Sequence, residues 1–409
     1  MSLPTTLSTA WRNIVRQLNR SRAALAAIAF GVVAMMLAAG FIDWNLRFGR
    51  DNTIQSQLGH LQVMKPGFLD HGRADPYAYL LPPPSATDEA ALAALPGFRV
   101  AAPRLLINGL ASSGETTLSF IGEGVDATAE QQLSAALRFS AGRNLLPGEP
   151  QTAIVGEGLA RNLGLTPGAQ LVLIANTENG GISAVEAEVV GLFQSISQAY
   201  DDSALRIPIE LARQLMKSEG EHLRLILLED TADTARAHQQ LNQALDQSRY
   251  QVVPWQELAD FYNKTSALFK KQVGVIRFII ALIIVLAISN TMSMAVMERM
   301  SEIGTMMALG TRQRGILTMF VLEGVILGVL GAALGVVLGT GLALLLSAIG
   351  IPMPASPGMA WGYEAGVLIS IDNIVVAAGI ALLTTLLASL YPAWRASREP
   401  IVDALRTRQ

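Results

Sequence analysis

The chain has no cysteine among its 409 residues, and histidine is limited to four scattered positions, His60, His71, His222 and His238. The absence of cysteine excludes disulfides, thiolate metal ligands and thiol redox chemistry within the chain. The histidines show no HExxH or comparable spacing, so the sequence predicts no metal site. His71 lies near Asp70 and Asp75, and we expect this small cluster to belong to a surface loop.

Lysine is also scarce, with five residues, Lys65, Lys217, Lys264, Lys270 and Lys271. A phosphate-binding loop of the Walker type requires glycine immediately before its lysine, and here Met, Met, Asn, Phe and Lys occupy those positions. The sequence also lacks a GxSxG nucleophile elbow. We therefore expect a non-catalytic chain without a bound nucleotide, metal or other cofactor. Any ATP and magnesium that its function requires would be held by a partner chain.

Charged residues make up only 15% of the sequence, whereas hydrophobic residues make up 51% and the mean hydropathy is positive. This balance is typical of an integral membrane protein. The first three long uncharged runs can each cross a hydrocarbon core of roughly 30 Å. The four runs are Ala23 to Ile42, Phe278 to Met297, Gly324 to Ile349 and the shorter Ile374 to Leu390.

We therefore predict a membrane protein with four transmembrane α-helices and a large α/β periplasmic domain inserted between helices 1 and 2. The first run exceeds the apolar region of a signal peptide, so we expect an uncleaved anchor rather than a cleaved leader. Trp361 and Tyr363 before the fourth run, with Tyr391 and Trp394 around its end, are candidate interfacial anchors. The predicted spans are residues 23–42, 272–297, 316–349 and 374–391.

The distribution of basic residues predicts the orientation. Residues 43–271 hold 18 Lys+Arg and 26 Asp+Glu, a net charge of −8, and an acidic domain gives no support to nucleic-acid binding. By the positive-inside rule, we expect both termini to be cytoplasmic and residues 350–373 to form a short periplasmic loop. An exported domain of 229 residues without cysteine is compatible with a bacterial periplasm but does not require one, and we expect the protein to lie in a bacterial inner membrane. The flanking basic residues are Arg12, Arg16, Arg20, Arg22, Arg299, Arg312, Arg314, Arg395, Arg398, Arg406 and Arg408.

Residues 43–271 mix helical and strand periodicity, which predicts an α/β domain in two lobes. The turn NTENGGIS indicates a hairpin, because Asn-Gly tolerates positive φ. Expected helices are 87–95, 157–163, 209–216 and 231–247, and expected strands are 116–121, 170–175, 185–193 and 224–228.

Two helical segments at the membrane have special features. Residues 1–22 are expected to form a cytoplasmic amphipathic helix with an apolar stripe of Leu7, Trp11, Val15 and Leu18; a helix on the membrane surface and an ordinary juxtamembrane flank remain alternatives. Apolar spacing from Trp255 to Met297 predicts one helix of about 60 Å, which would project as a stalk. A loop followed by a separate span is the alternative there.

Small residues recur every three or four positions in the third span, which predicts close packing against another helix. They are Gly324, Gly328, Gly331, Gly335 and Gly339. The sequence leaves open whether the partner is another span of this chain or a second subunit. Residues 298–315 connect the second and third spans as an amphipathic, methionine-rich segment, with helical character to Leu309 and Gly310 as its end. We expect this segment to lie in a groove of a partner rather than on lipid headgroups.

The run MERMSEIGTMMALGTRQRGILTMFVLEGVILGVLGAALGVVLG closely resembles the signature of ABC transporter permeases of the MacB, FtsX and LolC–LolE family, the mechanotransmission group. In that signature the segment E-R/K-x-x-E-I-G-x-x-x-A-L-G is the coupling helix. The end YPAWRASREPIVDALR, in the predicted cytoplasmic tail 392–409, and the segment from AGRNLLPGEP to VVGLF resemble other parts of the same family. The matching positions, and thus the expected ATPase-coupling residues, are Glu298, Arg299, Glu302, Ile303, Gly304, Ala308, Leu309 and Gly310.

The resemblance implies that two permeases, of the same or similar chain, pair and bind ABC ATPase subunits that drive periplasmic movement. With 22 residues before the first span, the ATPase is expected to be a separate chain, which is nearest to the lipoprotein-releasing type. Cargo would be a lipoprotein or another amphiphile, with a possible periplasmic adaptor or lipoprotein carrier. The alternative is an FtsX-like signal transmitter that activates a periplasmic partner such as a cell-wall hydrolase. Glu323 matches a family glutamate, and we expect it to hydrogen-bond a neighbouring helix.

Overall fold

The computed structural model describes residues 3–398 apart from residues 17, 73, 196 and 356–360. The predicted cytoplasmic tail beyond Arg398, including Pro400, Ala404 and Leu405, therefore lies outside the described residues. The chain divides into a helical unit, Met1–Leu46 with Thr265–Ile351 and Glu364–Gln409, and a second unit, Arg47–Lys264 with Pro352–Tyr363. We call the second unit the inserted domain.

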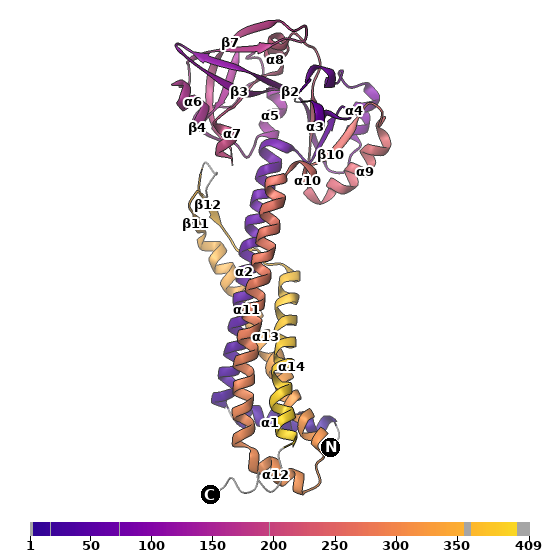
Figure 1. The fold of residues 1–409 in the computed structure, drawn as a ribbon, viewed down its shortest axis with the longest axis vertical. Coiled ribbons are helices and arrows are strands. Elements are labelled where there is room, and N and C mark those ends of the chain that lie inside the picture. Colours follow the sequence, from indigo (N-terminus) through magenta and orange to yellow (C-terminus); the bar gives the residue numbers. More distant parts are fainter. Residues whose placement is uncertain (1–2, 17, 73, 196, 356–360, 399–409) are drawn as a thin grey trace. The chain divides into compact units, whose positions relative to one another are not determined.

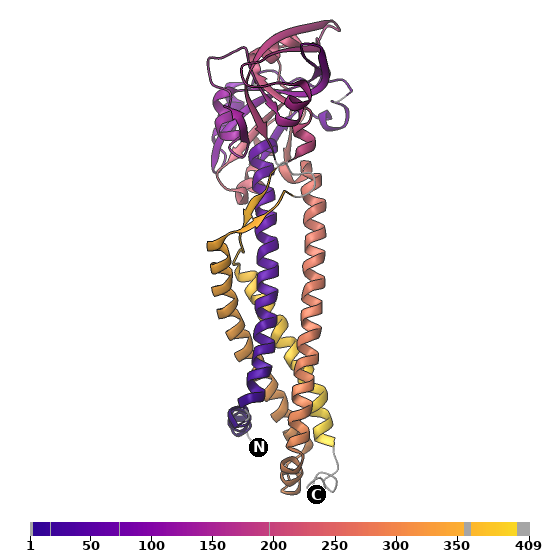
Figure 2. The same ribbon diagram turned by 90° about the vertical axis from the view of Figure 1, so that its left-hand side faces the viewer.

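Within the described part of the helical unit, four helices are long and apolar enough to cross a membrane, as the sequence predicts. Figures 1 and 2 show them running alongside one another, with the two shorter helices α1 and α12 at one end of the unit. The long helices are α2 (Leu18–Thr53), α11 (Asp260–Glu298), α13 (Gln313–Ile349) and α14 (Ile371–Arg398), and the short ones are α1 (Leu3–Arg16) and α12 (Met300–Ala308).

Several helix boundaries differ from the sequence prediction. Residues 1–22 do not form one amphipathic helix, since α1 ends at Arg16 and α2 begins at Leu18. Helix α11 starts at Asp260 and not at Trp255, because the side chain of Trp255 is buried in the inserted domain and the backbone leaves the helical region at Ala259 (φ −87°, ψ 55°). Helix α2 continues past the apolar run to Thr53. Helix α14 contains Pro392 and ends only at Arg398, whereas the prediction ended the span at residue 391. Packed neighbouring helices allow proline inside membrane helices.

The inserted domain is built on one ten-stranded sheet in the part of the chain that the structure describes, in the order β10-β1-β9-β2-β3-β8-β5-β7-β4, with β6 beside β2 and β7. Most neighbours are antiparallel, but β3 pairs with β8 and β5 with β7 in parallel. The strands are β1 (Leu61–Met64), β2 (Phe98–Ser113), β3 (Thr116–Val125), β4 (Arg138–Gly142), β5 (Thr152–Gly156), β6 (Gln170–Asn176), β7 (Ile182–Gln194), β8 (Ala204–Pro208), β9 (Leu223–Leu228) and β10 (Gln251–Pro254).

The long strand β2 contributes to two separate hydrophobic cores. Leu105 and Ile107 belong to one core, and Phe98 and Ala101 pack against the other. Its first half pairs with β9, and its second half pairs with β3 and β6. The accompanying helices are η1 (Ile54–Leu58, a π-helix), α3 (Phe68–His71), η2 (Tyr77–Tyr79), α4 (Ala86–Ala93), α5 (Ala127–Leu133), α6 (Glu157–Leu163), α7 (Gln198–Asp201), α8 (Ile209–Met216), η3 (Thr231–Asp233), α9 (Thr234–Ala244) and α10 (Trp255–Leu258).

The predicted hairpin joins β6 to β7, and its turn places Gly180 at φ +75°. Between α13 and α14, the predicted loop contains a two-stranded sheet of β11 (Ile351–Met353) and β12 (Tyr363–Ala365). Two of the candidate interfacial anchors contact other side chains of the protein here. The ring of Trp361 lies 3.7 Å from Arg138 Cζ, and Tyr363 stacks on Phe48 at 4.5 Å between ring centroids.

Candidate coupling site

Helix α12 is a short helix between two sharp changes of backbone direction. Arg299 separates it from α11 with φ −101° and ψ 13°, which interrupts the helical path. At the other end, Gly310 has φ +92°, and the N–H groups of Gly310 and Thr311 donate to the carbonyls of Met307 and Met306. This is the Schellman ending, which favours glycine because of the positive φ. The helix therefore ends at Ala308, one residue before the predicted end.

One face of α12 belongs to the protein core. Ile303 is 1% exposed and packs in a cluster with Phe320 of α13 and Ala393 of α14, and Gly304 is buried beside it. Of the eight predicted coupling residues, Arg299, Ile303 and Gly304 are thus buried within the chain. The structure leaves the other five on the surface, namely Glu298, Glu302, Ala308, Leu309 and Gly310.

A buried polar clamp holds the start of α12. Arg299 Nη1 lies 3.0 Å from Glu323 Oε1, and the two side chains are 9% and 5% exposed. Asn13 of α1 completes the clamp, because its Nδ2 donates to Glu323 Oε1 at 2.6 Å and its carbonyl accepts from Arg299 Nη2 at 3.2 Å. The clamp joins α1, the α11–α12 junction and α13. Glu323 therefore hydrogen-bonds a neighbouring helix, as predicted.

Asn13 was not predicted from the sequence as part of this site. A polar side chain between the buried Ala10 and Ile14 of α1 is the available signal, but its partners lie 286 and 310 residues away. On the opposite side of α1, Trp11 and Val15 are 50% and 47% exposed, which fits a helix with a free apolar stripe.

The exposed side of α12 combines charge with one apolar tip. Leu309 is 82% exposed, although most of its neighbours in the helix are packed. Glu302 approaches Arg16 at 4.0 Å between exposed side chains, a contact of small energetic value. Arg312 and Arg314 are exposed just beyond the helix. This surface can make an apolar contact and charge pairs with a partner without disturbing the clamp.

The five glycines of α13 are all buried against other helices of the same chain. A Cβ atom on Gly324 would meet Ser389 of α14, and one on Gly331 would lie 2.7 Å from Ile28 Cβ of α2. The remaining contacts are Gly328 with Thr385, Gly335 with Val32, and Gly339 with Met36. The glycine stripe therefore packs against α14 at Gly324 and Gly328 and against α2 from Gly331 onward.

The inserted domain contains a second buried ionic cluster, which the sequence analysis missed. Arg206 of β8 is fully buried and contacts Glu130 Oε1 at 2.6 Å and Glu123 Oε2 at 3.1 Å. Arg104 of β2 contacts the second oxygen of Glu130 at 2.7 Å. Arg206 Nη2 also donates to the carbonyl of Ser56 in η1 at 2.7 Å. The cluster thus ties the π-helical continuation of α2 to the sheet.

Burial controls the titration of several groups in the inserted domain. Burial alone would raise the pKa of Glu130, but Arg104 and Arg206 hold it below its usual value. Burial lowers the pKa of both His60 and His222 to about 4, so these imidazoles are neutral near pH 7. Each uses both ring nitrogens: His60 pairs with Thr231 and the Leu228 N–H, and His222 pairs with Pro76 O and the Leu106 N–H. They are structural residues.

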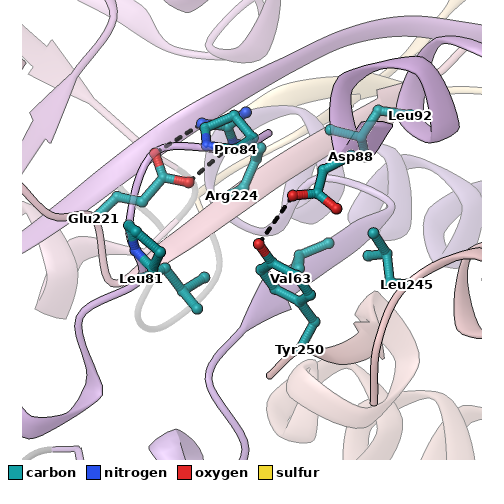
Figure 3. A pocket seen from close by; sticks show the side chains of 10 residues that line it. Val63, Leu81, Pro84, Asp88, Leu92, Glu221, Arg224, Leu245 and Tyr250 are labelled. Atoms are coloured by element: carbon teal, nitrogen blue, oxygen red, sulfur yellow. Dashed lines mark hydrogen bonds and ion pairs between the residues drawn. The ribbon is translucent and has the colours of Figure 1, made fainter. Parts of the chain in front are cut away.

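A small crevice in the inserted domain brings two pairs of polar side chains together, shown in Figure 3. Glu221 and Arg224 form a bidentate pair there, and Tyr250 donates to Asp88 at 3.0 Å. Its volume of about 20 Å³ accommodates little more than a water molecule. Among the described residues, no group of three or more His, Asp or Glu side chains is placed to hold a metal ion.

Comparison with known families identifies both parts of the chain. The MacB-like periplasmic core domain family matches residues 22–244, and the FtsX-like permease C-terminal family matches residues 274–401. The macrolide export ATP-binding/permease protein MacB of Rhodospirillum rubrum is 28% identical over 415 residues, covering 97% of this chain and 59% of that protein.

Two further relatives are permease proteins. An uncharacterized ABC transporter permease of Methanocaldococcus jannaschii is 25% identical over 273 residues, covering 65% of this chain and 64% of that protein. The lipoprotein-releasing system transmembrane protein LolC of Xylella fastidiosa is 26% identical over 295 residues, covering 67% of this chain and 69% of that protein. The chain therefore spans less than two thirds of the first two relatives. With four apolar helices and a periplasmic domain inserted between the first and second, the chain belongs to the MacB, FtsX and LolC family of ABC transporter permeases.

Proposed function

We propose that this chain is the non-catalytic permease subunit of an ABC transporter and that α12 is its coupling helix. ATP and magnesium would be bound by a separate ATPase subunit, and a second permease, of the same or a similar chain, would complete the assembly. In this proposal the protein lies in a bacterial inner membrane with both termini and α12 in the cytoplasm. ATP-driven movement of α12 would then reach the periplasmic domain through the long helices.

The exposed side of α12 is the observation that supports this proposal most strongly. Leu309 is 82% exposed at the tip of a helix whose other face is locked by Ile303 and the Arg299–Glu323 clamp. A rigidly held helix with a free apolar tip transmits displacement instead of absorbing it, because packed cores resist compression. The helix-in-groove mode of recognition matches this arrangement.

The proposed cargo is a lipoprotein or another amphiphile taken from the outer leaflet, with a periplasmic adaptor or lipoprotein carrier as a possible further partner. The relative named as a lipoprotein-releasing system protein supports this choice. The relative named as a macrolide exporter supports the broader class of amphiphilic substrates. The membrane lipids themselves surround the exposed apolar faces of the four helices.

Affinity purification of the tagged chain from its native membrane tests the ATPase partnership. We expect the wild-type chain to retain an ATP-hydrolysing subunit, and Leu309→Ser or Glu302→Lys to lower its retention at least tenfold with unchanged thermal stability. Leu69→Ser is the matched control, because Leu69 is 47% exposed in the inserted domain. Absence of any ATPase from the wild-type preparation would overturn the proposal.

The response of the ATPase rate separates a transporter from an FtsX-like signal transmitter. The family match of residues 274–401 is compatible with both. A transporter should be stimulated by an amphiphilic lipopeptide. Stimulation only by a periplasmic protein partner, such as a cell-wall hydrolase, would replace the transporter proposal by the signalling alternative.

A further inference from the structure

Helix α1 has a second side that the clamp does not use. Figures 1 and 2 show α1 lying across the direction of the long helices, at one end of the helical unit. Its inner side is fixed to that unit, because Ile14 is buried and Asn13 belongs to the clamp. Ser21 at the start of α2 also donates from Oγ to the Ile14 carbonyl at 2.9 Å. The outer side of α1 takes part in none of these contacts.

The contacts of Asn13 place α1 at the boundary of the apolar runs. Asn13 binds Arg299, two positions after the second run, and Glu323, one position before the third. Ile14 lines the same small crevice as Ala24, the second residue of the first run. Each of these runs is long enough to cross a hydrocarbon core of roughly 30 Å. Because all three begin or end beside α1, this helix lies at the edge of the hydrocarbon core and meets the lipid surface there.

The outer side of α1 carries one apolar strip and one basic strip. Trp11 and Val15, four positions apart, form the apolar strip and are each about half exposed. Arg12 and Arg16 form the basic strip and are both exposed. At about 100° per residue, the arginines lie roughly 100° further around the helix than the apolar strip and opposite Ile14. A helix with arginines on one face and a tryptophan on the next is typical of a helix in the membrane interface.

The charges at this end of the helical unit favour an anionic partner. Among the described residues of 8–22, 298–315 and 391–398, exposed arginines outnumber the exposed carboxylates, which are those of Glu298 and Glu302. Arg16 lies 4.0 Å from Glu302, but both side chains are exposed, so another anion replaces this weak contact at little cost. Such a surface attracts anionic headgroups more strongly than zwitterionic ones, whose ammonium opposes the arginines. The exposed arginines are Arg12, Arg16, Arg22, Arg312, Arg314, Arg395 and Arg398.

We propose that α1 binds an anionic phospholipid surface, with Arg12 and Arg16 on the lipid phosphates and Trp11 and Val15 against the acyl chains. Guanidinium groups bind phosphate oxygens through paired N–H donors. Each arginine at an anionic surface raises the affinity roughly fivefold, so the two together favour an anionic over a zwitterionic lipid by roughly 10–25-fold. This lipid contact needs no ATPase subunit and is the same on either side of the membrane, so it stands independently of the proposed function.

Short-range quenching by lipids tests this contact in the full-length chain. Because the chain has no cysteine, Val15→Cys gives a single attachment site for a bimane fluorophore beside the two arginines. The labelled protein is reconstituted into mixed bilayers of phosphatidylcholine and phosphatidylglycerol, in which one lipid at a time carries brominated chains. We expect phosphatidylglycerol to be enriched at the fluorophore by roughly 10-fold or more. Arg12→Gln combined with Arg16→Gln should remove this preference, whereas Arg12→Lys combined with Arg16→Lys should retain most of it.

Arg161→Gln combined with Arg236→Gln is the matched control, because both arginines are exposed in the inserted domain. This control should leave the lipid preference unchanged. Equal quenching by the two brominated lipids, or no quenching by either, would refute the binding of an anionic lipid at α1. So would loss of an ATPase subunit from the Arg12 and Arg16 glutamine variant with unchanged lipid preference, because the outer side of α1 would then bind that subunit. Lipid preference is measured without an ATPase, so failure here and failure of the proposed coupling role remain distinguishable.

Discussion

At the residue scale, the clamp of Asn13, Arg299 and Glu323 explains why a charged motif can lie between two apolar spans. The ion pair is shielded from solvent, and each member is needed to compensate the other. Arg299, although it belongs to the sequence motif, therefore stabilises the fold of the site and is not part of its exposed surface. A sequence motif does not separate these two roles, because both kinds of residue recur at fixed spacing.

Removal of one member of the clamp should destabilise the protein more than removal of both charges. We expect Glu323→Leu to cost about 3–5 kcal/mol, since it leaves the Arg299 cation buried and unpaired. The double variant Arg299→Met with Glu323→Leu should recover most of that loss. Thermal unfolding of the purified protein in detergent measures the difference. A double variant as unstable as the sum of the two single variants would show that the pair is not coupled.

The buried histidines predict acid sensitivity of the inserted domain. Burial lowers the pKa of His60 and His222 to about 4, whereas an unfolded histidine titrates near 6.5. The unfolded state therefore binds more protons below pH 6.5, so stability falls as the pH decreases from about 6.5 to about 4. At pH 5 each histidine should cost on the order of 2 kcal/mol.

Thermal unfolding of the full chain at pH 7 and pH 5 measures this loss. We expect the variant with His60→Gln and His222→Gln to show a smaller pH dependence than the wild type, although it starts from lower stability at pH 7. The control is His71→Gln, because His71 is exposed. An unchanged pH dependence in the double variant would rule out the two histidines as its cause.

At the element scale, α13 packs closely against both α14 and α2. Its glycine stripe brings α14 close to its first half and α2 close to its second half, because a missing Cβ lets two backbones approach. The spacing of the glycines was legible in the sequence, but the identity of their partners was not. The spacing of the glycines is a property of one helix, whereas the packing partner depends on how a second helix is placed.

The effect of a glycine substitution in α13 on stability should depend on whether that glycine contacts another helix. Gly331→Ala would place a Cβ atom 2.7 Å from the Cβ of Ile28, close to the backbone of α2, where no side-chain rotation relieves the contact. We expect a destabilisation of about 1–3 kcal/mol, measured as a lower unfolding temperature in detergent. Gly341→Ala is the control on the same helix, since nothing lies within 4 Å of that position. Equal effects of the two substitutions would contradict the packing role.

Several elements of the inserted domain follow the local sequence closely. Helices α6 and α8 have the predicted bounds, and the β6–β7 hairpin turns where Asn-Gly stands. The start of α11 was misplaced because Trp255 continues the helical periodicity while its side chain packs in the core of the inserted domain. The end of α12, the candidate coupling helix, was predicted to within one residue, because Gly310 marks it with positive φ.

At the scale of the whole molecule, the absence of cysteine permits a direct measurement of topology. A single cysteine placed at exposed Glu115 or at exposed Gln313 would be the only thiol in the protein. In intact cells whose outer membrane has been made permeable, we expect a membrane-impermeant maleimide to label Glu115→Cys but not Gln313→Cys. Both should react after the inner membrane is disrupted. Labelling of Gln313→Cys in intact cells would contradict a cytoplasmic coupling helix.

The sequence by itself determined the four spans, the inserted domain between the first two, the end of α12, the candidate coupling helix, and the family resemblance. These features depend on local properties, namely hydropathy over about 20 residues, helical period and the backbone freedom of glycine. Only the tertiary structure decided which coupling residues are buried, that Asn13 completes the Arg299–Glu323 clamp, and that Arg206 joins η1 to the sheet. Those contacts join residues 24 to 310 positions apart, and no local pattern specifies such pairings because they arise when separate elements pack.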